Sequence, residues 1–165
     1  MLYHGSNSLI AGQLEPRISF DYEPLVYATD DYMYALLRAG KFNPNKFLIK
    51  EDYNGMNHPI QLIEIVPGAF KKTFETPGYI YLVDGGTFKP HGKNEYVSTT
   101  PVRIKQITPI TDIWYHISNN PRFELIYYEE SENYWNTIRG GKDGYLKRRE
   151  ERAKTLKEEN EWMKR

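Results

Sequence analysis

The chain has 165 residues, with 22 Lys plus Arg and 22 Asp plus Glu, so its formal net charge at pH 7 is zero. This balance argues against tight, sequence-independent nucleic-acid binding, which depends on neutralising many phosphates, although it leaves room for a local basic patch. The chain has no cysteine, which excludes a disulfide framework, a cysteine-ligated metal and a thiol nucleophile.

The length fits one domain, which can bury about two-thirds of the surface of its unfolded chain. The sequence has neither a stretch of about 18 apolar residues nor a basic N-terminal region followed by an apolar run, so we expect a soluble, cytoplasmic protein without a membrane partner. Tyrosine is abundant, with 14 copies. Its apolar ring and polar hydroxyl suit half-buried strands and sites that stack planar ligands.

The first quarter of the chain predicts short elements. Residues 1–4 predict a strand, and residues 8–14 predict one or two helical turns that end before Pro16, because the residue preceding a proline avoids the α region. Residues 18–24 predict a loop. Residues 25–28 are apolar and predict a second strand.

A group of N-cap residues at positions 29–31 predicts the start of a clear helix, over residues 31–39. Gly40 follows as the C′ residue that ends the helix. The polar stretch 41–59 contains Pro44, Gly55 and Pro59, and predicts an irregular connection with a helical turn near Phe47.

Strand patterns dominate the middle of the chain. Residues 60–66 and 78–83 predict strands, with a turn or short helix at 68–74 between them, and a turn at the Asp-Gly-Gly sequence that starts at Asp84. Residues 88–93 predict a loop.

Two more strands follow, over residues 95–99 and 101–113, and Pro109 restricts the second one to a sheet edge or ends it there. Many short strands with one clear early helix predict a mixed α+β or β-rich domain, with its site residues on strands and strand ends.

The C-terminal part has a different character. Residues 117–128 predict one more structured stretch, interrupted by Pro121, and the glycines at 140–141 predict a hinge. Residues 147–165 are nearly all strong helix formers with sparse apolar side chains. Their charge pairs at i,i+4 spacing favour a solvated terminal helix, and a tail that docks a partner is the alternative.

The four histidines predict no metal site, because no two of them have metal-ligand spacing. His58 and His91 lie in polar, Pro/Gly-flanked segments and are interpreted as surface loop residues. His116 lies near two aromatic residues, where a half-buried packing role is an equal alternative. His4 is ambiguous when it is considered alone.

Three segments carry more information together than separately. They are YHGS at residues 3–6, VYATDDYMYAL at 26–36 and NEYVSTTPV at 94–102. Their order and strand context resemble the signature strands of the ADP-ribosyltransferase family, in its His-Tyr-Glu branch. The three segments are similar to those of the poly(ADP-ribose) polymerases. The overall layout, including GYIYLV at 78–83, resembles the compact bacterial rifampin ADP-ribosyltransferases still more closely. The resemblance covers residues 2–112.

The resemblance implies an α+β fold with a split antiparallel β-sheet core, few helices and a C-terminal helical tail. It divides the chain into an ADP-ribosyltransferase-like domain at 1–115, an extension packing on that domain at 116–140, and a charged terminal helix at 141–165. The tail after Trp114 is not explained by it. No regulatory domain like that of the polymerases fits into the chain, so chain elongation is not expected.

The implied function is NAD-dependent mono-ADP-ribosyl transfer, or NAD hydrolysis, by cleavage of the nicotinamide–ribose bond. NAD is then the substrate, and the acceptor is a protein, a small molecule or water, with nucleic acid disfavoured. The resemblance makes Glu95 the catalytic carboxylate, which binds the ribose 2′-hydroxyl and stabilises an oxocarbenium-like transition state. His4 hydrogen-bonds a ribose hydroxyl on the adenosine side, and Tyr27 packs against the nicotinamide ring. The rifampin-modifying group departs from this pattern, because it lacks a glutamate at the position of Glu95.

The remaining site residues implied by the resemblance bind the nicotinamide end of NAD. Gly5 offers its backbone N–H and C=O to the carboxamide, where glycine allows a flat ligand to approach the main chain closely. Ser6 adds a hydrogen bond to the same group. Tyr32 or Tyr34, on the following helix, closes the other face of the ring.

Other interpretations remain open. Without the resemblance, His4 is an ordinary edge-strand residue, Tyr27 a core residue and Glu95 an exposed acid at the start of a strand. A catalytically silent module that binds NAD, ADP-ribose or a protein is one functional alternative.

An RNA 2′-phosphotransferase, which shares the fold and uses NAD, is a further alternative. Its chemistry needs basic side chains that converge on a phosphate. Arg17, Arg38 and Arg103 are scattered along the sequence, so this alternative ranks lower.

Overall fold

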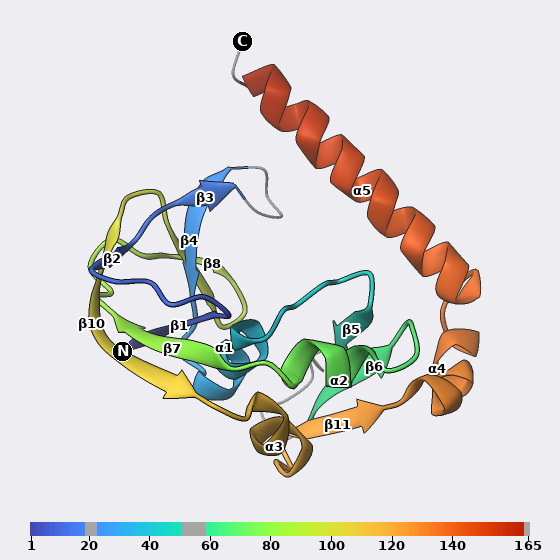
Figure 1. Cartoon of the computed structure of the whole chain (residues 1–165). Helices are drawn as coiled ribbons and strands as arrows, with labels where there is room; N and C mark the ends of the chain where they lie inside the picture. The colour runs from blue at the N-terminus through green and yellow to red at the C-terminus, as the bar shows by residue number, and fades with distance from the viewer. Residues whose placement is uncertain (19–22, 51–58, 164–165) are drawn as a thin grey trace.

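Antiparallel pairing organises most of the computed structural model, which describes residues 1–18, 23–50 and 59–163 (Figure 1). One sheet has the spatial order β1 (Leu2–Ser6), β7 (Gly78–Val83), β10 (Val102–Ile110) and β2 (Gln13–Leu14), and all of its pairs are antiparallel. Pro109 lies in the part of β10 that pairs only with β7, which agrees with the prediction of an edge position.

A second antiparallel sheet has the order β3 (Arg17–Ile18), β4 (Pro24–Ala28), β9 (Glu95–Ser98) and β8 (Lys89–Gly92). It is joined to the first sheet by a bridge between Tyr3 and Thr29. The amide of each of these residues donates a hydrogen bond to the carbonyl of the other, over 2.7 and 2.9 Å. β1 and β4 therefore lie side by side, and this brings residues 3–6 next to the segment that starts at residue 26.

The third sheet combines the middle of the chain with its C-terminal part. β6 (Ile60–Glu64) pairs with β5 (Phe47–Lys50) in the antiparallel direction and with β11 (Phe123–Ile126) in the parallel direction. A strand of the segment after residue 115 thus pairs directly with a strand from the middle of the chain.

The helices are mostly short. They are α1 (Tyr32–Ala39), α2 (Ala69–Phe74), α3 (Ile113–Ser118), the 3₁₀ turn η1 (Tyr128–Glu130), α4 (Glu132–Asn136) and α5 (Gly141–Met163). Over the described residues, no helix combines the length and the apolar character needed to cross a membrane. The chain is thus a mixed α/β protein with several antiparallel sheets, few helices and a C-terminal helix, as predicted at that level.

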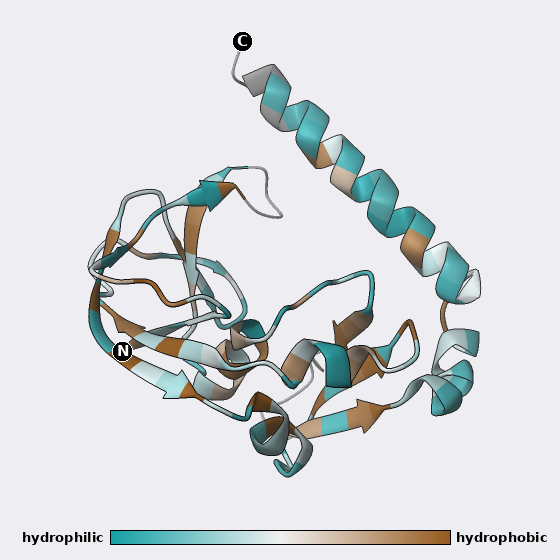
Figure 2. Ribbon diagram, viewed as in Figure 1, coloured by the Kyte–Doolittle hydropathy of each residue, from teal (hydrophilic) through white to brown (hydrophobic). Residues whose placement is uncertain are grey.

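Buried apolar residues form three clusters. Figure 2 colours the ribbon by the hydropathy of each residue and shows apolar stretches on the strands and short helices, whereas α5 is mostly hydrophilic. The largest cluster surrounds fully buried Phe47 and joins α1, α2 and α3 to the third sheet. A second cluster surrounds fully buried Tyr81 between the first two sheets. A third, around Trp135, includes Tyr145 and Leu146 and thereby anchors the beginning of α5.

The strongest sequence patterns predicted their elements correctly. Helix α1 begins after its N-cap Asp31, whose carboxylate accepts hydrogen bonds from the amides of Met33 (2.9 Å) and Tyr34 (3.3 Å), and it ends at Gly40. The strands expected at 60–66, 78–83, 95–99 and 101–113 correspond to β6, β7, β9 and β10. The turn or short helix expected at 68–74 is α2.

Several local predictions were wrong. Residues 8–14 form no helical turn, because the Tyr81 hydroxyl accepts a hydrogen bond from the Ile10 amide and donates one to the Ser8 carbonyl, and the segment ends in β2. Phe47 begins strand β5 instead of a helical turn. The loop expected at 88–93 contains β8.

Gly40 ends α1 as predicted, with an extended backbone at a φ of −77° instead of a left-handed one. The position has no space for a side chain, because a Cβ there would lie 2.8 Å from the Thr73 carbonyl oxygen. Parts of the connections expected at 18–24 and 41–59, including His58, lie outside the described residues.

Candidate functional site

A cavity of about 850 Å³ opens between β1, β4, α1, β5 and β8. Its lining includes His4 from β1, Tyr27 from β4 and Glu95 from the start of β9. These three residues come from residues 3–6, 26–36 and 94–102, so segments that lie far apart in the sequence face one space.

His4 is held by its neighbour in the adjacent strand. Its Nδ1 lies 2.7 Å from the carbonyl oxygen of Tyr27, and because a carbonyl can only accept, Nδ1 carries the proton. Burial lowers the pKa of His4 below its ordinary value, the Tyr27 carbonyl partly opposes this change, and the charge of Arg17 adds to it. The neutral ring therefore has an unprotonated Nε2, which can accept a hydrogen bond from a ligand hydroxyl.

Tyr27 is half-buried in the cavity wall, and its ring centre lies 6.0 Å from that of His91, at an interplanar angle of 76°. This edge-to-face contact connects β4 to β8. The sequence interpretation placed His91 in a surface loop, and the structure instead places it on β8, exposed and lining the cavity.

Glu95 follows Asn94, whose positive φ of 60° turns the chain into β9. Its carboxylate lies 3.6 Å from the Nη2 atom of Arg38, and both side chains are about 30% exposed, at 28% and 30%. Arg38 also donates a hydrogen bond to the Tyr34 hydroxyl over 3.0 Å, and its guanidinium lies 4.7 Å from the ring centre of Phe42. Glu95 therefore faces the cavity beside a cation that α1 holds in place.

Two of the four other predicted binding residues line the cavity and two do not. Gly5 and Tyr34 belong to the lining. Ser6 lies outside it, and its hydroxyl accepts a hydrogen bond from the Ser8 amide. Tyr32 packs edge-on against Tyr3, with ring centres 5.4 Å apart, and is also absent from the lining.

Gly5 is required by the packing of α1. A Cβ at this position would collide with the backbone carbonyl oxygen of Ala35. The glycine therefore lets α1 lie directly on β1, and the same close approach places Tyr34 and Arg38 at the cavity. The close approach of a helix backbone therefore explains this glycine, whereas the predicted approach of a ligand to Gly5 stays a prediction.

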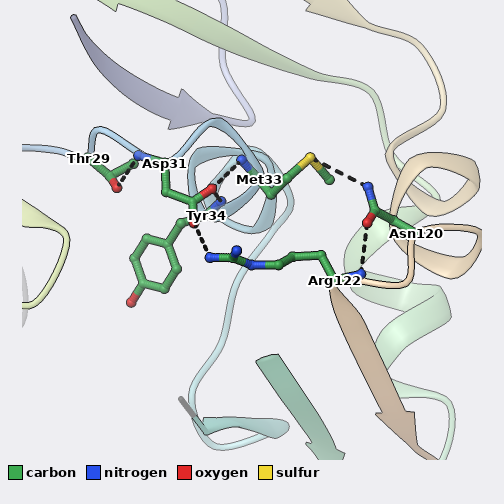
Figure 3. A network of polar contacts seen from close by, with 6 residues as sticks. All are labelled: Thr29, Asp31, Met33, Tyr34, Asn120 and Arg122. Carbon is green, nitrogen blue, oxygen red and sulfur yellow. Dashed lines mark hydrogen bonds and ion pairs between the residues drawn. The ribbon is translucent and has the colours of Figure 1, made fainter. Parts of the chain in front are cut away.

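A polar network connects the N-terminus of α1 to two residues from the C-terminal half of the chain (Figure 3). Asp31, the N-cap, forms an ion pair of 2.6 Å with Arg122, and its own amide donates to the Thr29 hydroxyl. The side chain of Asn120 accepts from the Arg122 amide and contacts the sulfur of Met33. This network fixes the helix that supplies Tyr34 and Arg38 to the cavity.

Basic side chains outnumber acidic ones in the lining. The described lining residues include four that carry a positive charge and one acid, Glu95. The four cations are Arg38, Lys41, Lys46 and Arg149. In a chain with equal numbers of acidic and basic residues, this local excess favours an anionic ligand.

Sequence reasoning missed most of these cations. Of the three arginines considered for phosphate chemistry, only Arg38 lines the cavity, and Arg17 and Arg103 do not. The i,i+4 spacing of Tyr34 and Arg38 could have indicated their shared face. Arg149 gave no signal, because it lies in a helix with charged residues on all sides.

The described residues contain no group of three His, Asp or Glu side chains placed to hold a metal ion. His116 is exposed on α3, with its ring centre 5.7 Å from that of Tyr115. The cavity residues are instead suited to hydrogen bonding, stacking and charge stabilisation.

Comparison of the chain with protein-family models, with curated proteins and with solved structures gives no match.

Proposed function

We propose that the chain is an NAD-dependent mono-ADP-ribosyltransferase or NAD glycohydrolase, built on an ADP-ribosyltransferase-like fold. The observation that supports this proposal is the shared position of His4, Tyr27 and Glu95 in the lining of one cavity. A volume of about 850 Å³ is within the usual range for small-molecule sites.

In the proposed reaction, the bond between the nicotinamide nitrogen and C1′ of its ribose breaks. The bonding electrons leave with nicotinamide, which becomes neutral, and positive charge develops on the ribose. The carboxylate of Glu95 stabilises this charge and accepts a hydrogen bond from the 2′-hydroxyl. A nucleophile then attacks C1′ and loses its proton. The nucleophile is water in hydrolysis and an acceptor group in transfer.

The other residues hold NAD for this step. The unprotonated Nε2 of His4 accepts a hydrogen bond from a hydroxyl of the adenosine ribose, and the ring of Tyr27 packs on nicotinamide, with Tyr34 available from α1. Aromatic pairs of this kind contribute about 0.5–1.5 kcal/mol beyond the area that they bury.

The proposal is tested by incubating the protein with NAD and measuring the released nicotinamide. We expect turnover by the wild type and a loss of about 10²–10³-fold in rate for Glu95→Gln, because one preorganised charge is removed from the transition state. Glu124→Gln, at an exposed position on β11, is the matched control and should keep the wild-type rate. Unchanged turnover in Glu95→Gln would remove Glu95 from its proposed role.

The ion pair between Arg38 and Glu95 favours a second candidate, a silent module that binds NAD or ADP-ribose without cleaving NAD. A carboxylate that is engaged by a guanidinium 3.6 Å away is less available to a ribose hydroxyl. Saturable NAD binding without nicotinamide release, in both the wild type and Arg38→Gln, would support this candidate over the enzyme.

A further inference from the structure

The C-terminal helix reaches the cavity through one side chain. Arg149 of α5 belongs to the cavity lining, and its Nη1 donates a hydrogen bond of 2.8 Å to the carbonyl oxygen of Pro44. The two residues are 105 positions apart in the sequence. Figure 1 shows the connection between α1 and β5, which contains Pro44, extending toward α5.

The position of Arg149 depends on packed contacts at the beginning of α5. Tyr145 and Leu146 pack against the cluster around Trp135, and the rings of Trp135 and Tyr145 lie 5.5 Å apart. Arg149 follows one helical turn after Tyr145, on the same side of the helix. Its half-buried side chain is therefore presented by an anchored part of the helix.

Arg149 shares this part of the cavity with the basic connection between α1 and β5. Lys41 and Lys46 come from that connection and also line the cavity. A guanidinium has five N–H donors, so the bond to Pro44 leaves others for a ligand. Arginine is well suited to phosphate because its planar donors can bind two oxygens of one group.

We propose that Arg149 and Lys46 form an anion subsite that binds the pyrophosphate of a dinucleotide ligand, so that the C-terminal helix is part of the binding site. This inference rests on the proposed function for the nature of the ligand. His4, Tyr27 and Glu95 engage the ribosides and the nicotinamide, and the subsite engages the charged group that connects the two ribosides. The segment that supplies Arg149 lies outside residues 2–112, which carry the family resemblance.

The subsite is tested by calorimetric titration of the full chain with ADP-ribose and with adenosine, which lacks phosphate. A charge-assisted hydrogen bond contributes about 1.5–3 kcal/mol, so Arg149→Gln should weaken ADP-ribose binding by about 10- to 100-fold and leave adenosine binding unchanged. Arg152→Gln, an exposed position on the same helix, makes the same charge change and should bind ADP-ribose like the wild type.

Lys46→Gln gives a second, independent variant, because it keeps the contact between Arg149 and Pro44. It should weaken ADP-ribose binding in the same direction, and its result decides the test if a thermal melt shows Arg149→Gln to be unfolded. Wild-type affinity in both folded variants would overturn the subsite. An equal loss of adenosine and ADP-ribose affinity would overturn it as well.

Binding of inorganic pyrophosphate separates this inference from the proposed function. Pyrophosphate binding that is weakened by Arg149→Gln supports the subsite, even in a protein that releases no nicotinamide from NAD. Nicotinamide release with the same NAD affinity in the wild type and Arg149→Gln would overturn the subsite alone. Wild-type protein that binds neither ADP-ribose nor pyrophosphate at millimolar concentration would also overturn it.

Discussion

Glu64 shows how one buried carboxylate connects separate parts of this chain. It is 2% exposed, and its two oxygens accept hydrogen bonds from the backbone amides of Phe70 (2.9 Å) and Tyr128 (3.0 Å). The first amide belongs to α2 and the second to η1. Glu64 therefore holds the C-terminal segment against the third sheet.

Replacing Glu64 with alanine should strongly destabilise the fold. Two amides would lose their partner, at about 1–3 kcal/mol each, so we expect the free energy of unfolding to fall by about 2–6 kcal/mol in urea denaturation. The exposed Glu129→Ala is the control and should change it by less than about 0.5 kcal/mol. Equal effects of the two substitutions would show that the two hydrogen bonds of Glu64 do not matter for stability.

His4 should make stability depend on pH in a defined direction. Burial lowers its pKa in the folded protein below 6.5, so the unfolded chain binds its proton more readily. The contribution of the neutral ring to stability is complete above pH 6.5 and is lost as the pH falls toward the folded pKa. The slope in this window is at most about 1.4 kcal/mol per pH unit.

Urea denaturation between pH 5 and 8, on the wild type and His4→Gln, measures this effect. The wild type should lose stability below pH 6.5 more steeply than the variant, because the other three histidines are present in both proteins. Parallel pH profiles of the two proteins would contradict the lowered pKa of His4 in the folded protein.

At the scale of elements, α1 packs directly on β1 and β7, and it supplies Tyr34 and Arg38 to the cavity lining. Two glycines permit close approach to this helix, since a Cβ at Gly5 would collide with the Ala35 carbonyl oxygen and one at Gly78 with that of Ala39. The obstacle is helix backbone in both cases, which cannot move aside without moving α1.

Gly5→Ala should therefore displace α1 and destabilise the protein by about 3 kcal/mol or more, as in severe overpacking. The melting temperature should fall by roughly 10 °C, since 1 kcal/mol corresponds to about 2–4 °C at this chain length. Gly85→Ala is the matched control, because the nearest atom to its Cβ would be a side-chain carbon of Leu2 at 3.8 Å. If both variants melted at the same temperature, the proposed reason for Gly5 would be wrong.

Elements with a strong local pattern were predictable, and those that depend on distant partners were not. The N-cap at Asp31 and the apolar runs of β6 and β7 are local signals. β8 is exposed along its whole length and is a strand only because β9 pairs with it, so its sequence resembles a loop. β5 likewise depends on pairing with β6.

At the scale of the whole molecule, the site was predictable only in part. A family resemblance indicated His4, Tyr27 and Glu95, and the structure places all three in one cavity lining. Their packing neighbours were not predictable, because Arg38 reaches Glu95, and Arg149 reaches Pro44, through contacts between distant segments. Because α5 carries charged residues on all sides, its sequence does not indicate which side chain faces the cavity.

The distribution of charge is also a property of the whole molecule. The chain is neutral, yet the described cavity lining has four cations and one acid. The overall composition therefore says nothing about a small anionic ligand. For such a ligand, the balance of positive and negative side chains in the cavity lining matters more than the net charge of the chain. This balance depends on which residues the fold brings together.

The most direct test of the proposed site separates NAD affinity from NAD cleavage in Glu95→Gln. If Glu95 acts on charge that develops in the transition state, the dissociation constant for NAD should stay within about threefold of the wild-type value while nicotinamide release slows by about 10²–10³-fold. A wild-type protein that neither binds NAD at millimolar concentration nor releases nicotinamide would contradict the proposal.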